Sequence, residues 1–292
     1  MNVAWNEYDA LKLVAVRDAQ NAFVSEARLD AEWEKLRFHT RPELSEAVVE
    51  HQAFRERLRS LGASLLELAG DTSLTLDSIY TRDNIIVSPR GLILCNMGRA
   101  SRTAEGPFNA QAYAAQGFDV LGRIEAPGTL EGGDFIWLDE NTAVVGLGPR
   151  TNQAGIDQLH ALLGEQLELH VVPLPGVDHP DDVLHLMSII SPVDRNLAVV
   201  YKPFMPASFV DWLSARGIDF VEVPEQEFLP MACNVLALAP REVLMLENLP
   251  ETKRRLEQVG CRVQTYKGLE ISRKGEGGPT CLTRPLLREE RV

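Results

Sequence analysis

The chain has 292 residues, of which 45% are hydrophobic, and its formal net charge at pH 7 is −13. This apolar content supports a substantial core, and because no stretch resembles a linker we expect one domain over residues 1–292. The acidic charge argues against a nucleic-acid-binding surface and is compatible with a small cationic ligand. No signal-like leader and no run of about 18 apolar residues occurs, so we expect no membrane contact and a cytoplasmic location.

The first predicted elements are a strand, a helix and a second strand. The strand is LKLVAVRD, residues 11–18, and the helix covers residues 40–62. Thr40 and Glu43 have the spacing of a capping box, Pro42 suits a first helical turn, and Gly62 can end the helix. The strand LLEL follows the helix.

Four predicted hairpins come next, each made of two short apolar runs around a polar turn. They are NIIVSPRGLILC (84–95), DFIWLDENTAVVG (134–146), SIISPVDRNLAVVY (188–201) and NVLALAPREVLMLE (234–247). Their starts recur at intervals of about 50 residues, which indicates an internal repeat.

A helix and a further strand are predicted between successive hairpins. In residues 151–174, for example, Ile156, Leu159, Leu162 and Leu163 share one helical face before the strand-like LHVVPL. Each unit therefore has the order hairpin, helix, strand. The strand near the N-terminus supplies half of the hairpin of a fifth unit, which is split between the two ends of the chain. Five such units in a closed ring would point equivalent hairpin ends toward one axis.

Reactive or hydrogen-bonding side chains recur at the start of every unit. They are Asp83, the segment from Glu131 to Asp134, His185, Asn234 and Cys281. Cys281 lies 47 residues after Asn234 and follows a Gly-rich run, where the backbone can approach a substrate closely. The common phase of these residues predicts a site on the axis, with Cys281 as a reactive thiol.

The other cysteines do not form a recognisable site. Cys95, Cys233 and Cys261 are scattered, without a C-x-x-C pair or a nearby histidine cluster. We therefore expect free thiols rather than a zinc site or a disulfide framework.

Five segments carry a resemblance to a known family. They are LDSIYTRDNIIV (76–87), LEGGDFIWLDENTAVVGLGPRTNQAG (130–155), VLHLMS (183–188), MACNVLAL (231–238) and GGPTCL (277–282). The chain resembles the guanidino-group modifying enzymes of the pentein, or amidinotransferase-like, superfamily, and most closely the dimethylarginine dimethylaminohydrolases. This resemblance implies an α/β fold, a five-bladed propeller of ββαβ modules. It also implies a hydrolase without metal or cofactor.

The side chains suit chemistry at a guanidinium carbon. Cys281 would attack that carbon as a thiolate. His185 would protonate the leaving amine and then activate the water that resolves a covalent thiouronium intermediate. Asp83 and Glu131 would hold the planar cation by charge-assisted hydrogen bonds. The products would be citrulline and an amine. Asp134 is expected to support the Gly132-Gly133 turn instead.

The resemblance also places substrate-binding residues. Asp77, Arg102 and Arg150 would surround the α-amino and carboxylate groups of the amino acid. Thr103 is an alternative to Arg102 at its position.

One position bears on which guanidine is the substrate. Met187 stands where arginine deiminases typically carry an aspartate, and an apolar thioether favours an N-methylated arginine over free arginine. Three alternatives stay open: an arginine deiminase or dihydrolase, an amidinotransferase, and a non-catalytic binding protein of the same fold. The sequence allows a monomer or a homodimer. Residues 21–59 could form a lid or reshape the entrance.

Overall fold

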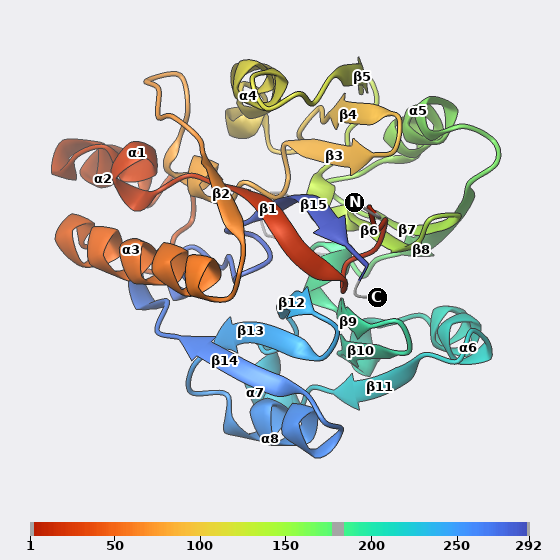
Figure 1. The fold of residues 1–292 in the computed structure, drawn as a ribbon. Helices are drawn as coiled ribbons and strands as arrows, with labels where there is room; N and C mark the ends of the chain where they lie inside the picture. The colour runs from red at the N-terminus through yellow and green to blue at the C-terminus, as the bar shows by residue number, and fades with distance from the viewer. Residues whose placement is uncertain (1–2, 177–183, 291–292) are drawn as a thin grey trace.

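The computed structural model describes residues 3–176 and 184–290. Five three-stranded sheets are arranged around one axis, with the helices on the outside of the ring (Figure 1). In each sheet the first two strands of the unit are antiparallel and the third runs parallel to the second. The predicted five-bladed α/β propeller is confirmed.

Four units are continuous in sequence, and each predicted hairpin is present. The first unit has β3 (Ile85–Ser88), β4 (Gly91–Leu94), α4 (Glu105–Ala114) and β5 (Val120–Arg123). The second has β6 (Phe135–Asp139), β7 (Thr142–Leu147), α5 (Gln153–Leu163) and β8 (Glu168–Pro173). The third has β9 (Ile190–Asp194), β10 (Leu197–Val200), α6 (Ala207–Ala215) and β11 (Asp219–Glu222). After α7 (Glu225–Phe228), the fourth has β12 (Leu236–Ala239), β13 (Glu242–Leu246), α8 (Pro250–Gln258) and β14 (Arg262–Tyr266).

The fifth unit joins the two ends of the chain, as its sequence pattern predicts. It contains β15 (Arg284–Glu289), β1 (Ala10–Val16), α1 (Ala19–Phe23), α2 (Glu26–Glu32), α3 (Leu44–Ser60) and β2 (Ser64–Glu67). The sheet order is β15-β1-β2, so pairing between the N-terminal and C-terminal strands closes the ring.

The helix predicted over residues 40–62 is shorter than expected. It begins at Leu44, and Glu43 has an extended backbone without a side-chain cap, so the expected Thr40 capping box is wrong. The Glu43 N–H donates instead to the Glu270 carboxylate over 2.7 Å, a tertiary contact that keeps this segment out of the helix. Gly62, with φ +98°, follows the helix end as expected.

Burial decreases from the axis outward. Every residue of β3, β10 and β12 is buried, whereas the third strands β2 and β5 are exposed at both ends. The inner strands are therefore the rigid frame of the ring, and the loops that precede them project from a fixed base.

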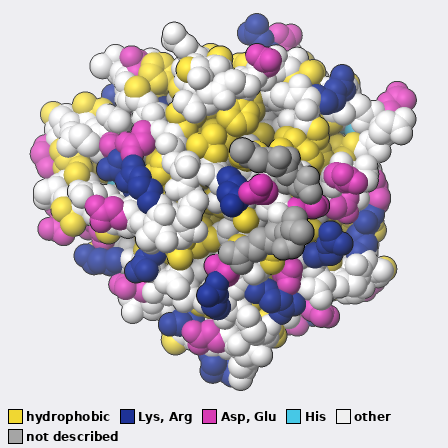
Figure 2. All heavy atoms as spheres, viewed as in Figure 1, with side chains coloured by type: hydrophobic (Ala, Val, Ile, Leu, Met, Phe, Trp, Pro, Cys, Tyr) yellow, Lys and Arg dark blue, Asp and Glu magenta, His cyan; other side chains and the backbone are white. Residues whose placement is uncertain are grey.

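The two ends of the inner strands carry different surfaces. Loops that precede β3, β6, β9 and β12 meet at one end. The far ends of β6 and β9 line a hollow of about 540 Å³ together with the N-terminal segment around Tyr8. On the face that carries both termini, acidic and basic side chains are interspersed (Figure 2). Within the described ranges, no helix combines the length and apolarity that a membrane span requires.

Candidate active site

Cys281 lies in the turn that leads into β15, and glycines hold this turn against its neighbours. A Cβ atom at Gly277 would come within 2.1 Å of the Tyr80 ring, and one at Gly278 within 2.5 Å of the Asn234 side chain. The Asn234 amide donates a hydrogen bond to the Cys281 sulfur over 3.2 Å. Cys281 is only partly buried, whereas the other three cysteines, also free as predicted, are buried.

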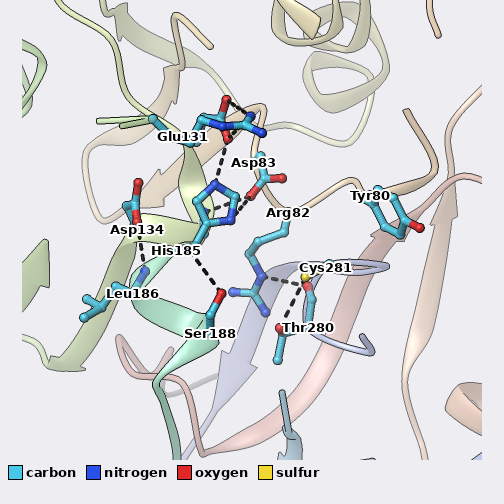
Figure 3. A network of polar contacts seen from close by, with 12 residues as sticks. Tyr80, Arg82, Asp83, Glu131, Asp134, His185, Leu186, Ser188, Thr280 and Cys281 are labelled. Carbon is cyan, nitrogen blue, oxygen red and sulfur yellow. Dashed lines mark hydrogen bonds and ion pairs between the residues drawn. The ribbon is translucent and has the colours of Figure 1, made fainter. Parts of the chain in front are cut away.

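His185 is fixed by backbone contacts on both sides of a short 3-10 turn, Leu186–Ser188. Its backbone N–H donates to the Ser188 hydroxyl over 3.1 Å, and the next N–H, that of Leu186, donates to Asp134 over 2.8 Å. Asp134 also accepts a hydrogen bond from the Thr151 hydroxyl, so these side-chain contacts support the segment that carries His185 and not the Gly132-Gly133 turn that we expected. The imidazole is thereby held between two carboxylates (Figure 3).

The two carboxylates beside the imidazole belong to Glu131 and Asp83. The Glu131 carboxylate lies 2.7 Å from His185 Nε2, and Asp83 Oδ1 lies 3.9 Å from Nδ1. A Cβ atom at Gly133 would lie 2.6 Å from Nδ1, so only glycine leaves room for the ring here.

Glu131 is fully buried, and its oxygens contact protein groups. One oxygen accepts from the Arg99 backbone N–H and the Arg150 guanidinium, both over 3.0 Å, and the other faces His185. We expected Glu131 to bind the substrate cation directly. In the structure its carboxylate instead bonds His185, the Arg99 N–H and Arg150.

Asp83 is held at the axis by two donors. Its Oδ1 accepts from the Gly133 N–H over 3.0 Å, and its Oδ2 accepts from Arg102 over 2.7 Å. Arg102 also binds Glu105. Thr103, the alternative at this position, is exposed and its hydroxyl donates to the Ala100 carbonyl. The arginine is thus the residue directed at the site.

Asp77 pairs with an arginine that the sequence pattern does not single out. Arg99 donates to the Asp77 carboxylate over 2.7 Å and to the Leu36 carbonyl over 2.9 Å. Leu36 belongs to the extended N-terminal segment, so that segment does reach the site. Arg99 lies after β4, away from a hairpin start, and no spacing in the sequence marks it.

The imidazole is strongly biased toward its charged form. Burial opposes the charge, but the carboxylates of Asp83, Asp134 and Glu131 outweigh burial and raise the pKa of His185 to about 9. Although burial alone would favour a neutral Glu131, its bond to His185 and the charge of Arg150 hold its pKa well below the ordinary value. At neutral pH the pair is an imidazolium with a carboxylate.

The thiol is biased toward its neutral form. Burial raises the pKa of Cys281, and the negative charge of Asp83 adds to this rise. Hydrogen bonds from Asn234 and Thr280 oppose it, as does the positive charge of Arg82. A cation bound beside Asp83 would neutralise the main unfavourable charge and favour the thiolate.

Two cavities meet at Cys281 and His185. The inner cavity, of about 30 Å³, is strongly charged and is lined by Asp77, Tyr80, Asp83, Arg99, Arg102, Arg150, His185, Gly275, Glu276, Gly277 and Cys281. The outer cavity, of about 450 Å³, shares His185, Glu276 and Cys281 and is otherwise mainly apolar. Six of the seven predicted site residues line the inner cavity, and Glu131 lies directly behind it.

Asp83, Glu131 and His185 together have the donor types of a metal site. Their ligand atoms lie within 4.8 Å of one another. However, His185 and Glu131 bond each other over 2.7 Å, and Arg102 and Arg150 bind the two carboxylates. This donor set fits a chain of ion pairs better than a metal ion, because His185 Nε2 and a Glu131 oxygen bond each other and two guanidinium groups already place positive charge beside the carboxylates.

Comparisons with known proteins give a consistent family. Residues 21–288 match the family described as N,N dimethylarginine dimethylhydrolase, eukaryotic. An N(G),N(G)-dimethylarginine dimethylaminohydrolase of Streptomyces coelicolor is 31% identical over 239 residues, which cover 81% of this chain and 84% of the relative. An arginine deiminase of Mycobacterium avium is 28% identical over 248 residues, which cover 72% of this chain and 60% of the relative.

Solved structures of 24% and 17% identity support the fold. The dimethylarginine dimethylaminohydrolase of Pseudomonas aeruginosa, in complex with citrulline, has a TM-score of 0.75 and 24% identity, covering 94% of this chain and 99% of its own. An amidinotransferase from Microseira wollei has a TM-score of 0.80 and 17% identity, covering 100% of this chain and 98% of its own.

The family match spans nearly the whole propeller and includes every residue of the site described above. The chain therefore belongs to the N,N dimethylarginine dimethylhydrolase family, within the guanidino-modifying hydrolases of the pentein superfamily.

Proposed function

We propose that the protein hydrolyses an N-methylated arginine to citrulline and methylamine or dimethylamine. The observation that carries the proposal is the pairing, across one cavity, of an accessible thiol with a buried imidazolium. The thiol is the nucleophile that a poorly electrophilic guanidinium carbon requires. The imidazolium is the acid that its basic amine leaving group requires.

The residues that line the inner cavity suit the amino acid part of the substrate, although the space between them, about 30 Å³, would have to widen to admit it. It presents Arg99, Arg102 and Arg150 together with Asp77 and Asp83. Guanidinium groups suit a carboxylate, and carboxylates suit an α-ammonium and a substrate guanidinium. The Tyr80 hydroxyl, buried here without a hydrogen-bond partner, is a further group that a polar ligand could engage. A cation that reaches Asp83 would bring its central carbon near the Cys281 sulfur.

Bond formation can then proceed in two halves. The Cys281 thiolate adds to the guanidinium carbon, and the carbon–nitrogen bond to the substituted nitrogen breaks as His185 gives its proton to the departing amine. The product of this half is a thiouronium linked to the sulfur. Neutral His185 next takes a proton from water, whose oxygen adds to the carbon. The carbon–sulfur bond breaks and returns its electrons to the sulfur, the remaining hydroxyl proton passes to solvent, and citrulline leaves.

Glu131 would act through His185. Its hydrogen bond orients the ring and stabilises the imidazolium that the first half requires. Glu131 is therefore proposed as a positioning residue, and Asp83 as the group that aligns the substrate cation.

A substrate panel tests this proposal. Purified protein is incubated with asymmetric dimethylarginine, monomethylarginine and arginine, and citrulline, ornithine and released amines are quantified. Citrulline with equimolar methylated amine is expected, and Cys281→Ser should abolish it while circular dichroism stays unchanged. Turnover of arginine alone would make the protein a deiminase. No turnover of any guanidine, together with equal labelling of all four thiols by 2-chloroacetamidine, would favour a binding protein.

A further inference from the structure

The outer cavity is much larger than a methylated amine needs. Its volume is about 450 Å³, comparable with pockets that hold whole small-molecule ligands. A dimethylamino group contributes only three non-hydrogen atoms. The cavity begins at the reacting residues, because Cys281 and His185 line it as well as the inner cavity.

Its outer wall is apolar and aromatic. Phe228 stacks on Tyr201 with ring centroids 3.7 Å apart. Phe204 meets the Phe228 ring edge-on, with centroids 5.0 Å apart. These contacts fix Phe228 before any ligand binds. Met187 and Met231 complete the wall, and thioether side chains adapt to ligands of different shape.

Apolar side chains at the mouth of this cavity remain in contact with water. Leu229 is 85% exposed and Phe204 is 37% exposed, although both line the cavity. Single exposed apolar residues are common, but here two lie on the wall of one concave site next to reactive groups. A ligand with an apolar part would remove this surface from water.

The charged residues of the outer cavity disfavour a cationic occupant. The Arg82 side chain lines it, is 1% exposed and has one terminal nitrogen without a hydrogen-bond partner. His185 adds a second positive charge. The one carboxylate, Glu276, is 2.8 Å from His39. A neutral group fits this environment better than an ammonium.

Substrate geometry connects the two cavities. A guanidinium carbon held at Cys281 has one nitrogen on the amino acid chain and another on the leaving amine. If the charged inner cavity takes the amino acid, the leaving amine is directed to the outer cavity.

From this we propose that the outer cavity, formed by Met187, Phe204, Phe228, Leu229 and Met231, binds a neutral apolar substituent on the leaving nitrogen. The substituent is larger than methyl, so the preferred substrates are Nω-alkyl arginines of about propyl to butyl size. This inference rests on the proposed hydrolysis. The bonds broken and formed are the same, and the proton of His185 leaves on the longer alkylamine.

A substrate series tests the inference. Citrulline formation is measured for Nω-methyl-, propyl- and butyl-arginine and for Nω-(3-hydroxypropyl)-arginine, which matches butyl in number of heavy atoms. Each buried methylene favours binding by roughly fourfold, so kcat/KM should rise by about tenfold or more from methyl to butyl. The hydroxypropyl compound should lose most of this gain.

Two variants locate the effect. Leu229→Ala and Phe228→Ala should lower the butyl-to-methyl ratio of kcat/KM by roughly three- to tenfold. Val49→Ala, a change of an exposed residue on α3, should leave the ratio as it is. Leu229→Ala removes a side chain that is mostly in solvent, so it tests the wall even where Phe228→Ala fails to fold.

Each outcome separates this inference from the proposed function. A value of kcat/KM that falls from methyl to butyl, or a ratio that both wall variants leave unchanged, overturns the inference while methylarginine hydrolysis stands. No citrulline from any substituted arginine overturns both.

Discussion

The hydrogen bond between Glu131 and His185 should raise the pKa of His185, and a conservative change can test this. Glu131→Gln removes the negative charge 2.7 Å from Nε2 but keeps the shape of the side chain. A hydrogen bond to a charged group contributes about 1.5 to 3 kcal/mol, and one pH unit corresponds to about 1.4 kcal/mol. The pKa of His185, about 9 in the native site, should therefore fall by about one to two pH units.

The reaction should respond with a definite pH dependence. At pH 8 the variant has less imidazolium to protonate the leaving amine, so a fall of one to two pH units in the pKa of His185 should lower kcat by roughly two- to tenfold. Near pH 6 most of the imidazole is protonated in both proteins, so this part of the defect should shrink. The defect in kcat is larger at high pH because a lower pKa of His185 leaves less protonated imidazole there.

Unfolding free energy gives an independent readout. A histidine whose folded pKa lies above its unfolded value of about 6.5 stabilises the protein fully below that pH. This contribution is lost as pH rises toward about 9, the pKa of His185 in the folded protein. Urea unfolding of the wild type should therefore lose more stability across this window than unfolding of Glu131→Gln, by about 2 kcal/mol.

NMR titration of the His185 ring gives the decisive measurement. Glu227→Gln is the matched control, because Glu227 is also buried but caps the start of α8 through Glu251 and Thr252, away from His185. If His185 titrates at the same pH in Glu131→Gln as in the wild type, Glu131 does not set its charge and the reasoning is wrong.

Three further changes test separate parts of the structure. Asn234→Asp keeps the acceptor used by the Thr280 N–H but places a negative charge beside the sulfur, so alkylation of Cys281 at pH 8 should slow by roughly tenfold; an unchanged rate would contradict the contact. Gly133→Ala puts a Cβ atom 2.6 Å from His185 Nδ1 and should lower kcat by roughly a hundredfold or more, whereas normal activity would show that the ring can move. His51 is buried without partners for its ring nitrogens, and burial lowers its pKa to about 3. As the pH falls, His51 is therefore protonated in the unfolded chain before it is protonated in the folded one. The wild type should lose about 2 kcal/mol more stability than His51→Leu between pH 7 and pH 5 in urea titrations, and equal losses would refute this account.

The repeat could be predicted because each unit contains the same local signals. Two apolar runs around a polar turn form a hairpin in four of the units, strands from the two chain ends replace the hairpin in the fifth, and all five sheets have the same pairing. The phase of Asp83, His185 and Cys281 followed from this regularity. The start of α3 could not be predicted, because Glu43 is held by Glu270, which is 227 residues away in sequence.

Contacts behind the site were also beyond the sequence pattern. Arg99 lies between hairpins, and its importance depends on how the chain brings Asp77, Leu36 and Glu131 around it. Glu131 was found by its phase, yet its phase does not tell whether the carboxylate faces the substrate or the imidazole. Such orientations are determined by tertiary packing.

Closure of the ring and assembly of the site depend on the same contacts. The Arg82 N–H donates to the Cys281 carbonyl and its side chain to the Thr280 carbonyl, while the Thr81 hydroxyl bonds both Ala15 and Leu282. These bonds join the cysteine turn to β1 and to the segment before β3. Because β15 pairs with β1, a chain whose ends have not paired lacks the frame that brings the thiol to His185.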